Sequence, residues 1–462
     1  MQKGFFMDRQ LEKNQVISLE ITGLTNEGNG AGHFGPNRFA VFVPDTAPGD
    51  RAQVRLVKVL KSYAYGRLEK LNRPSRDRME PDCPVSRVCG GCSLRHISYE
   101  AECRAKNGWI EDSLRRLAGI QPNLEPFQPS PSPDHYRNKA QYPVGQDEEG
   151  SIRIGFYAKR SHRLVDGGEC RLHPPVFTEI AQEVRRFLEK HRIPAYREET
   201  GEGLVRHLYL RIGQISGEIM VCLVINGRTL PHIQEFISLL KNRFPMVSSI
   251  VLNVNRNKGN VILGGECVTL WGRDTIRDTL AGVEVELSPL SFYQVNHDAA
   301  EKLYSVVKEY AGLTGTETVL DLYCGAGTIG LSLADRCKRL LGVEIIPEAI
   351  ENARANAARN GIQNAAFFCG DAGQAAARLA EEGIRPDVII LDPPRKGCDE
   401  AALEAVVRMN PGKVVMVSCN PATMARDCKR LAERGYRLER VRGADLFPRT
   451  CHVEAVVLMS RI

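Results

Sequence analysis

The chain has 462 residues, of which 43% are hydrophobic, and this length predicts two to four domains with apolar cores. No apolar run reaches the roughly 18 residues of a membrane-spanning helix, residues 1–15 turn acidic and polar too soon for a signal peptide, and 14 irregularly spaced cysteines do not suit a secreted disulfide framework. We therefore expect a cytoplasmic protein without membrane contact, whose formal net charge of +6 is compatible with nucleic-acid binding.

The first predicted element is a β-barrel over residues 14–72. The segments VISLEITGL, RFAVFVP, AQVRLVKVL and YAYGRLEKL are typical of short strands, and TNEGNGAGHFGPN has the composition of a turn. Four or five strands in about 60 residues predict a small, closed, OB-like barrel. Basic and aromatic side chains on it favour a single-stranded nucleic-acid platform, with a solvated barrel face as the alternative. They are Arg51, Arg55, Lys58, Lys61, Arg67, Lys70, Phe39, Tyr63 and Tyr65.

A cysteine segment follows the linker NRPSRDRMEPDCP. Cys83, Cys89 and Cys92 form a C-x5-C-x2-C pattern, and Cys170 is the candidate fourth thiol. Four thiolates suit zinc or an iron–sulfur cluster, and the ligand type alone favours structural zinc. The spacing is not the C-x3-C-x2-C of radical enzymes, so we do not expect radical chemistry. The alternative is four unconnected thiols, and Cys103 is a competing ligand that should lie on a helix.

The middle of the chain predicts an α+β domain. A helix is expected from about Tyr99 to Ala118, and residues 136–280 mix strand and helix patterns without a repeat. Two basic segments, HYRNKAQYPV and LVRHLYLR, are candidates for phosphate contacts, with solvated strand faces as an equally good interpretation. Their charged or ionisable residues are Arg137, Lys139, Arg206, His207 and Arg211.

From about residue 316, strands and helices alternate, which predicts a doubly wound parallel sheet. Such sheets bind ligands beyond the carboxyl ends of their strands, where this chain has GAGTIG at 325–330, Glu344, Asp371, Asp392 and Cys419. The glycine motif and a carboxylate about twenty residues later suit a dinucleotide or S-adenosylmethionine, because the carboxylate can accept both ribose hydroxyls. The Asp-Pro-Pro turn at 392–394 and a hairpin-linked last strand favour S-adenosylmethionine.

Cys419 ends the fifth strand and is followed by Asn-Pro, so its thiol is expected to face the cleft, although a buried thiol is the commoner case. A thiol has a use in methyl transfer to uracil, whose C5 is a weak nucleophile. Addition of a thiolate to C6 makes C5 enolate-like, and a base must later remove the C5 proton. Glu454 is the candidate base if the last strand runs antiparallel, with His452 as the rival.

The motifs SFYQVN, DLYCGAGTIGL, LDPPRKGC, SCNPATMARD and HVEAVV resemble those of the RNA uracil-C5 methyltransferases. The similarity covers nearly the whole chain, and it is greatest to bacterial 23S rRNA members with an N-terminal TRAM barrel. The resemblance implies Cys419 as nucleophile and Glu454 as base. It also implies cofactor contacts and a [4Fe-4S] cluster in a structural or RNA-positioning role, with zinc as the alternative. The cofactor residues are Gln294, Tyr323, Glu344 and Asp392, with Asp371 as an additional candidate, and the cluster ligands are Cys83, Cys89, Cys92 and Cys170.

The predicted architecture is multidomain α/β. Residues 1–75 are expected to form the TRAM-like OB β-barrel, 76–285 the central α+β domain with the Fe–S cysteine segment, and 286–462 a Rossmann-like class I methyltransferase domain. The expected reaction is S-adenosylmethionine-dependent methylation of a uridine at C5, on a base that has left its stack, by a monomer. The resemblance favours 23S rRNA over tRNA, because tRNA-specific relatives generally lack the barrel and the cluster.

Three alternatives stay open. An RNA cytosine-C5 methyltransferase would use the same thiol addition, but such enzymes carry a cysteine directly after the Asp-x-Pro turn, where this chain has Arg395. A non-catalytic RNA-binding module explains the barrel but not five polar strand ends. A nicotinamide oxidoreductase is compatible with the glycine motif alone.

Overall fold

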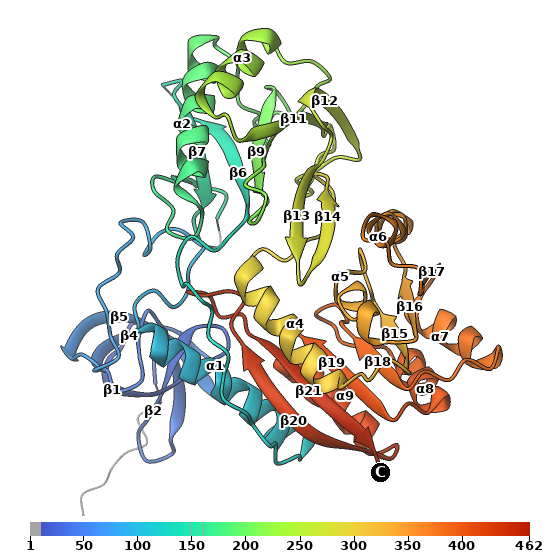
Figure 1. The fold of residues 1–462 in the computed structure, drawn as a ribbon. Helices are drawn as coiled ribbons and strands as arrows, with labels where there is room; N and C mark the ends of the chain where they lie inside the picture. Colours follow the sequence, from blue (N-terminus) through green and yellow to red (C-terminus); the bar gives the residue numbers. More distant parts are fainter. Residues whose placement is uncertain (1–10, 148, 160) are drawn as a thin grey trace, which may run out of the picture. The chain divides into compact units, whose positions relative to one another are not determined.

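The structure, a computed structural model, describes residues 11–147, 149–159 and 161–462 (Figure 1). The described chain forms two compact units, of which the first contains residues up to 86 together with 91–109 and 449–451, and the second contains the rest. No helix among the described residues is long and apolar enough to span a membrane. The expected absence of a signal peptide concerns residues 1–10, which lie outside the described residues. The domain boundaries at residues 75 and 285 stay predictions.

The first unit contains five strands. They are β1 (Val16–Leu24), β2 (Asn29–Phe34), β3 (Phe39–Pro44), β4 (Arg51–Val59) and β5 (Tyr63–Arg73). These strands close into a barrel in the order β1-β2-β3-β5-β4, which confirms the predicted barrel. Every second residue of β1 and β4 packs in its core, including Ile17, Leu19, Ile21 and Val54.

Strand β2 lies within the segment predicted as a turn, and that prediction was wrong. The inward positions of β2 are Gly30 and Gly32, so the strand lacks the apolar alternation that identifies its neighbours. A Cβ on Gly32 would lie 2.5 Å from the backbone oxygen of Glu20, and one on Gly30 would lie 2.0 Å from Oγ1 of Thr46. The close approach of neighbouring strands therefore requires glycine at both places.

A helix occupies the stretch predicted from Tyr99 to Ala118. It is α1 (Tyr99–Ser113), and a π-helical turn continues it over Leu114–Ala118. Gly119 then takes a left-handed conformation with φ of 70° and donates its N–H to the Leu114 oxygen, which ends the helix.

The second unit contains a seven-stranded sheet with the order β12-β11-β10-β9-β6-β7-β8. Its elements, with a separate hairpin, are β6 (Lys139–Gln146), β7 (Ile152–Tyr157), β8 (Leu164–Asp166), α2 (Pro175–Lys190), β9 (Val205–Ile212), β10 (Ile219–Ile225), α3 (Ile233–Arg243), β11 (Val247–Val254), β12 (Glu266–Gly272) and the hairpin strands β13 (Ile276–Leu280) and β14 (Val283–Leu287). Helices α2 and α3 pack Phe177, Val184 and Phe236 against the sheet. This mixture agrees with the predicted α+β region.

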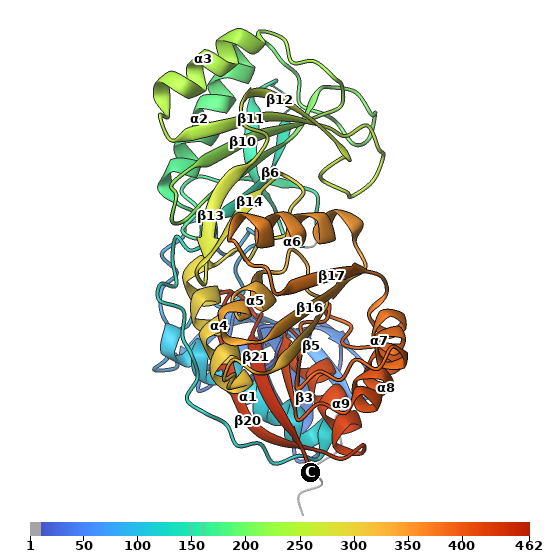
Figure 2. The same ribbon diagram turned by 45° about the vertical axis from the view of Figure 1, so that its right-hand side comes forward.

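The rest of the second unit is a doubly wound sheet. Its elements are α4 (His297–Ala311), β15 (Thr318–Leu322), α5 (Thr328–Leu331), a 3-10 turn (Ala334–Arg336), β16 (Arg339–Glu344), α6 (Pro347–Arg359), β17 (Ala365–Cys369), α7 (Ala372–Glu381), β18 (Val388–Leu391), α8 (Glu400–Met409), β19 (Lys413–Ser418), α9 (Pro421–Ala432), β20 (Tyr436–Ala444) and β21 (Glu454–Arg461). The strand order is β17-β16-β15-β18-β19-β21-β20. Helices α4, α5 and α6 cover one face, and α7, α8 and α9 cover the other (Figure 2).

Strand direction determines which residues share an edge of this sheet. Strands β15 to β19 are mutually parallel, and β21 runs antiparallel between β19 and β20. The carboxyl ends of the five parallel strands and the amino end of β21 therefore meet at one edge, as predicted.

Candidate active site

The glycine loop that follows β15 is anchored by the buried carboxylate of Asp321, a residue of that strand. Gly325 and Gly327 have φ of 55° and 80°, so both adopt the left-handed conformation that favours glycine. The N–H of Gly330 donates to Oδ2 of Asp321 at 3.0 Å, and a Cβ on Gly330 would lie 2.8 Å from that oxygen. Asn356 Nδ2 donates to the Ala326 oxygen at 3.1 Å and holds the loop from α6.

Asp321 is a site residue that the sequence analysis missed. It lies in β15 among apolar residues, and its Oδ1 has no hydrogen-bond partner among the described residues. Burial, followed by the negative charge of Asp392, raises its pKa to about 8. A carboxyl group inside an apolar strand just before a glycine loop was the available signal, because burying such a group requires a specific role.

Glu344 ends β16 and faces the glycine loop. Its Oε2 accepts the N–H of Gly325 at 3.1 Å, and its Oε1 accepts the N–H of Ile346 at 3.0 Å. The side chains of Ile345 and Ile346 beside it are 61% and 53% exposed. The carboxylate therefore has fixed oxygens next to an open apolar surface.

The other predicted cofactor residues lie in three places. The Asp371 carboxylate accepts the N–H groups of Gly373 and Gln374, so it caps helix α7. Tyr323 has φ of 66°, and its buried hydroxyl has no hydrogen-bond partner among the described residues. Gln294 precedes α4, and its backbone oxygen accepts from Asn138 Nδ2 at 2.9 Å.

Asp392, Cys419 and Glu454 lie at the ends of three neighbouring strands, β18, β19 and β21. Ser418 pairs with Ala455, so Cys419 and Glu454 are the next residues on the two antiparallel strands. The predicted antiparallel direction of the last strand is confirmed. The arrangement brings one thiol and two carboxyl groups to one point of the sheet edge.

Burial and mutual repulsion control the charges of these three groups. Burial raises the pKa of Cys419 to about 11, with further contributions from Glu454 and Asp392, while Arg395 opposes the shift. Burial also raises the pKa of Asp392 to about 7. Burial and then Asp392 raise the pKa of Glu454 well above its usual value, again against Arg395. Neighbouring carboxyl groups whose pKa values are raised by burial are typical of acid–base sites.

The loop that carries Arg395 is bound to helix α9. The backbone oxygen of Arg395 accepts from Asn420 Nδ2 at 3.1 Å and from Thr423 Oγ1 at 3.3 Å. The N–H of Cys398 donates to Oδ2 of the buried Asp427 at 2.8 Å. These bonds fix the Asp-Pro-Pro turn against Cys419, while the Cys398 side chain is buried at 2% exposure.

The basic residues of β9 are buried, so the prediction that they contact phosphate was wrong, and so was the alternative of a solvated strand face. Arg206 Nη1 donates to the backbone oxygens of Asn255 and Asn257, and Arg211 donates to those of Ser288 and Ser291. Burial lowers the pKa of His207 to about 4, so this side chain is neutral. The β9 cations hold loops of their own chain.

The four predicted cluster cysteines are all half-buried and belong to both units. In the first unit, the oxygen of Cys83 accepts the N–H of Ser86 at 3.1 Å, which forms a turn. In the second unit, Cys89 forms a β-bridge with Ala158, the residue directly after β7. Cys170 lies four residues after the end of β8, and its backbone oxygen accepts the N–H of His173. The cluster itself stays a prediction.

Known proteins resemble the chain along nearly its whole length. A model of the tRNA (Uracil-5-)-methyltransferase family matches residues 98–462, and a TRAM domain model matches residues 10–68. An uncharacterized RNA methyltransferase of Bacillus cereus is 42% identical over 457 residues, which are 99% of each chain. Another, from Halalkalibacterium halodurans, is 43% identical over 451 residues, covering 97% of this chain and 98% of the relative.

A solved structure agrees with these similarities. The Pyrococcus abyssi tRNA (uracil-54, C5)-methyltransferase in complex with S-adenosyl-L-homocysteine has a TM-score of 0.77 and 30% identity, covering 96% of this chain and 100% of that one. The class of protein is thereby defined as S-adenosylmethionine-dependent RNA methyltransferases. The chain belongs to the tRNA (uracil-5-)-methyltransferase family, and an N-terminal TRAM domain precedes its family region, as the motifs predicted.

Proposed function

We propose that this enzyme methylates C5 of a uridine in RNA through a transient covalent bond between the sulfur of Cys419 and C6 of the uracil. The observation that carries the proposal is the placement of Asp392, Cys419 and Glu454 at neighbouring strand ends. A thiol and a carboxyl group side by side meet the two requirements of C5 alkylation, which are a nucleophile for C6 and a base for the C5 proton.

The residues act in sequence. The Cys419 thiol loses its proton to solvent, the resulting thiolate adds to C6, and the C5 carbon gains the electron pair that attacks the methyl group. When bound, S-adenosylmethionine would supply this methyl group as a sulfonium, and its sulfur would be left as a neutral thioether. The carboxylate of Glu454 then takes the C5 proton, the C5–C6 double bond re-forms, and the Cys419 sulfur leaves. Arg395 favours the charged forms of both side chains, because its charge lowers the pKa of each.

The cofactor would lie along the strand ends on the side of the glycine loop. Its ribose fits Glu344, and its adenine fits the exposed side chains of Ile345 and Ile346. Asp321 Oδ1 is a buried polar atom without a hydrogen-bond partner among the described residues, and a polar ligand or ordered water can satisfy it. Gln294 and Asp392 complete the proposed set, with Asp371 acting through its cap on α7.

Labelled cofactor tests the reaction. The purified protein, RNA and methyl-labelled S-adenosylmethionine should yield labelled 5-methyluridine after digestion to nucleosides. Labelled 5-methylcytidine would instead assign the cytosine-C5 reaction, and cofactor binding without a labelled nucleoside would indicate an RNA-binding protein without this activity.

The proposed substrate is 23S rRNA, with tRNA as the second candidate. The similarity to a tRNA-modifying enzyme favours tRNA. The match covers 96% of this chain, so the uncovered 4% is too short to contain the barrel, and the tRNA-modifying enzyme therefore resembles this chain in the barrel as well. The barrel alone therefore does not distinguish the two. Mass mapping of 23S rRNA and tRNA from a strain without this protein would assign the substrate. We further propose that the enzyme acts in the cytoplasm as a monomer.

Two cations next to Gln294 are proposed to bind an RNA phosphate. Asn138 Nδ2 donates to the backbone oxygen of Gln294, and the neighbours of Asn138 in the chain are Arg137 and Lys139. Arg137 Nε is buried without a hydrogen-bond partner, and Lys139 pairs in the sheet with Arg211. Burial, followed by the charges of Arg211 and Arg137, lowers the pKa of Lys139 to about 8. An anion is the ligand that relieves this repulsion.

Lys139→Met should weaken RNA binding and reduce the slope of log K against log salt by about 0.7–0.9, the share of one phosphate contact. Lys139 loses its proton as pH rises through about 8, so the wild-type affinity should fall between pH 7 and 9 more steeply than that of the variant. Binding isotherms at several salt concentrations measure both effects. The control is Lys338→Met, an exposed lysine before the amino end of β16. Equal slopes for Lys139→Met and wild type would contradict the contact.

The cysteine set is proposed to hold a [4Fe-4S] cluster with a structural or RNA-positioning role. Cys89→Ser should bleach the visible absorbance of anaerobically purified protein, because a cluster that loses one of its thiolate ligands is no longer stably held. Iron and zinc analysis of the wild type measures the alternative. Unchanged colour in the variant, or one zinc per wild-type chain, would contradict the cluster.

A further inference from the structure

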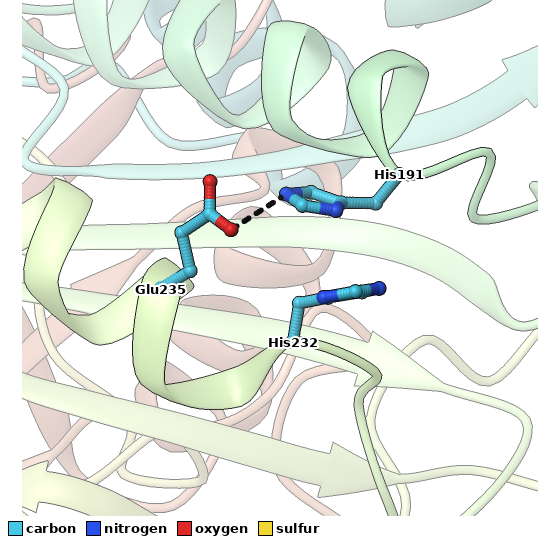
Figure 3. Close-up of side chains that lie close together, drawn as sticks. All are labelled: His191, His232 and Glu235. Carbon is cyan, nitrogen blue, oxygen red and sulfur yellow. Dashed lines mark ion pairs between the residues drawn. The ribbon is translucent and has the colours of Figure 1, made fainter.

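We propose that His191, His232 and Glu235 form a binding site for a divalent transition metal ion such as Zn²⁺ or Ni²⁺. The site lies on the sheet of strands β6 to β12, at the helices α2 and α3 (Figure 3). His191 directly follows α2, His232 directly precedes α3, and Glu235 lies in the first turn of α3. The site is independent of the proposed methyl transfer, because none of its residues belongs to the doubly wound sheet.

The three donor atoms are close enough for one ion. One ligand atom from each residue lies within 4.8 Å of the other two. Metal–ligand bonds of about 2.0–2.1 Å separate the ligands of a tetrahedral ion by roughly 3.4 Å. The remaining adjustment, at most about 1.4 Å between two ligand atoms, falls mainly on His232 and Glu235, which are exposed.

His191 provides a ring nitrogen held beside Glu235. Its side chain is only 9% exposed, and Nε2 lies 3.2 Å from Oε2 of Glu235, an ion pair marked in Figure 3. Nε2 has no other partner among the described residues. The ring nitrogen and the carboxylate therefore already face one point, where an ion between them would contact both.

His232 is held beside the same point. Its ring stacks on His191 with centroids 4.0 Å apart and planes inclined by 27°. The residue is at the N-cap position of α3, yet its side chain makes no capping hydrogen bond. The imidazole is therefore not used by the helix and can turn its edge to an ion.

Glu235 supplies the negative charge. Its Oε1 is paired with Lys190, which leaves Oε2 for the metal. Two imidazoles and one carboxylate are borderline donors that prefer Zn²⁺, Ni²⁺ or Co²⁺ to Mg²⁺ or Ca²⁺, and water would complete the coordination. A bound ion would tie the end of α2 to the start of α3.

Metal titration of the full-length protein tests the site. Calorimetry with Ni²⁺ should show one more bound equivalent for the wild type than for His232→Ala. Any Ni²⁺ bound by the cysteines is the same in both proteins and does not affect this difference. His232 is exposed, so its loss should leave the fold intact, which circular dichroism verifies. The matched control is His162→Ala, because His162 lies 3.2 Å from Glu198 in an exposed pair that is not part of the three-residue group.

The titration has two decisive outcomes. Loss of one equivalent in His232→Ala and in His191→Ala, with His162→Ala equal to wild type, supports the site. Zn²⁺ should then also raise the unfolding temperature of the wild type more than that of His232→Ala. Equal stoichiometry in the wild type and His232→Ala, or the same loss in His162→Ala, would overturn the proposal.

Discussion

Cys419→Ala is expected to lower the rate of RNA methylation on the order of 10⁴-fold or more, while the affinity for S-adenosylmethionine stays within about twofold. The large loss follows because C5 of uracil does not attack a sulfonium without the electrons that addition at C6 provides. Cofactor affinity is retained because the proposed cofactor residues lie before α4, at the carboxyl ends of β15, β16 and β18 and at the start of α7, and none of them is Cys419. Single-turnover rates and a cofactor titration measure the two quantities.

The matched control for this prediction is Cys267→Ala. Cys267 is exposed on β12 of the other sheet in the second unit, so this variant should turn over at the wild-type rate. Methylation by Cys419→Ala at a tenth or more of the wild-type rate would refute the nucleophile assignment. A loss of cofactor affinity as large as the loss of rate would instead make Cys419 a binding residue.

Glu454→Gln is expected to reduce turnover by about 10²–10⁴-fold and to accumulate an RNA–protein adduct. Addition and methyl transfer precede proton removal, so the variant should stop with the sulfur still bonded to C6. Burial raises the pKa of Glu454 well above its usual value, and the amide has the same shape as the buried acid, so the variant should preserve the fold. A shifted band in a denaturing gel, dependent on cofactor, measures the adduct.

Glu433→Gln provides the control for charge removal alone. Glu433 is exposed at the end of α9, so this variant should turn over normally and leave no shifted band. Product formation by Glu454→Gln without an adduct would move the base elsewhere. His452, whose Nδ1 lies 3.4 Å from Arg395, would then be the first candidate.

The sheet edge could be predicted because its signals are local in the sequence. Each strand from β15 to β19 is a short apolar run, and the first polar group after the run must lie at the carboxyl end. Glu454 required only one further inference, the antiparallel direction of β21. The barrel was predicted for the same reason, except for β2, where Gly30 and Gly32 replace the apolar residues.

The missed features depend on tertiary structure. Seven of the eight residues of β9 are buried, and the guanidiniums of Arg206 and Arg211 reach backbone oxygens of distant loops, which a strand pattern does not reveal. Asp321 was hidden inside an apolar run. His191 and His232 are 41 positions apart, and only the packing of α2 and α3 on one sheet brings them together.

The central claim is the bond between Cys419 and C6, and trapping that bond tests it most directly. RNA whose target uridine carries fluorine at C5 can be attacked and methylated, but it offers no C5 proton, so the sulfur cannot leave. Wild-type enzyme, this RNA and S-adenosylmethionine should give a stable adduct. Mass spectrometry after digestion should find the methylated fluorouridine on the peptide that contains Cys419. Attachment to another residue, or methylation with no adduct at all, would contradict the account.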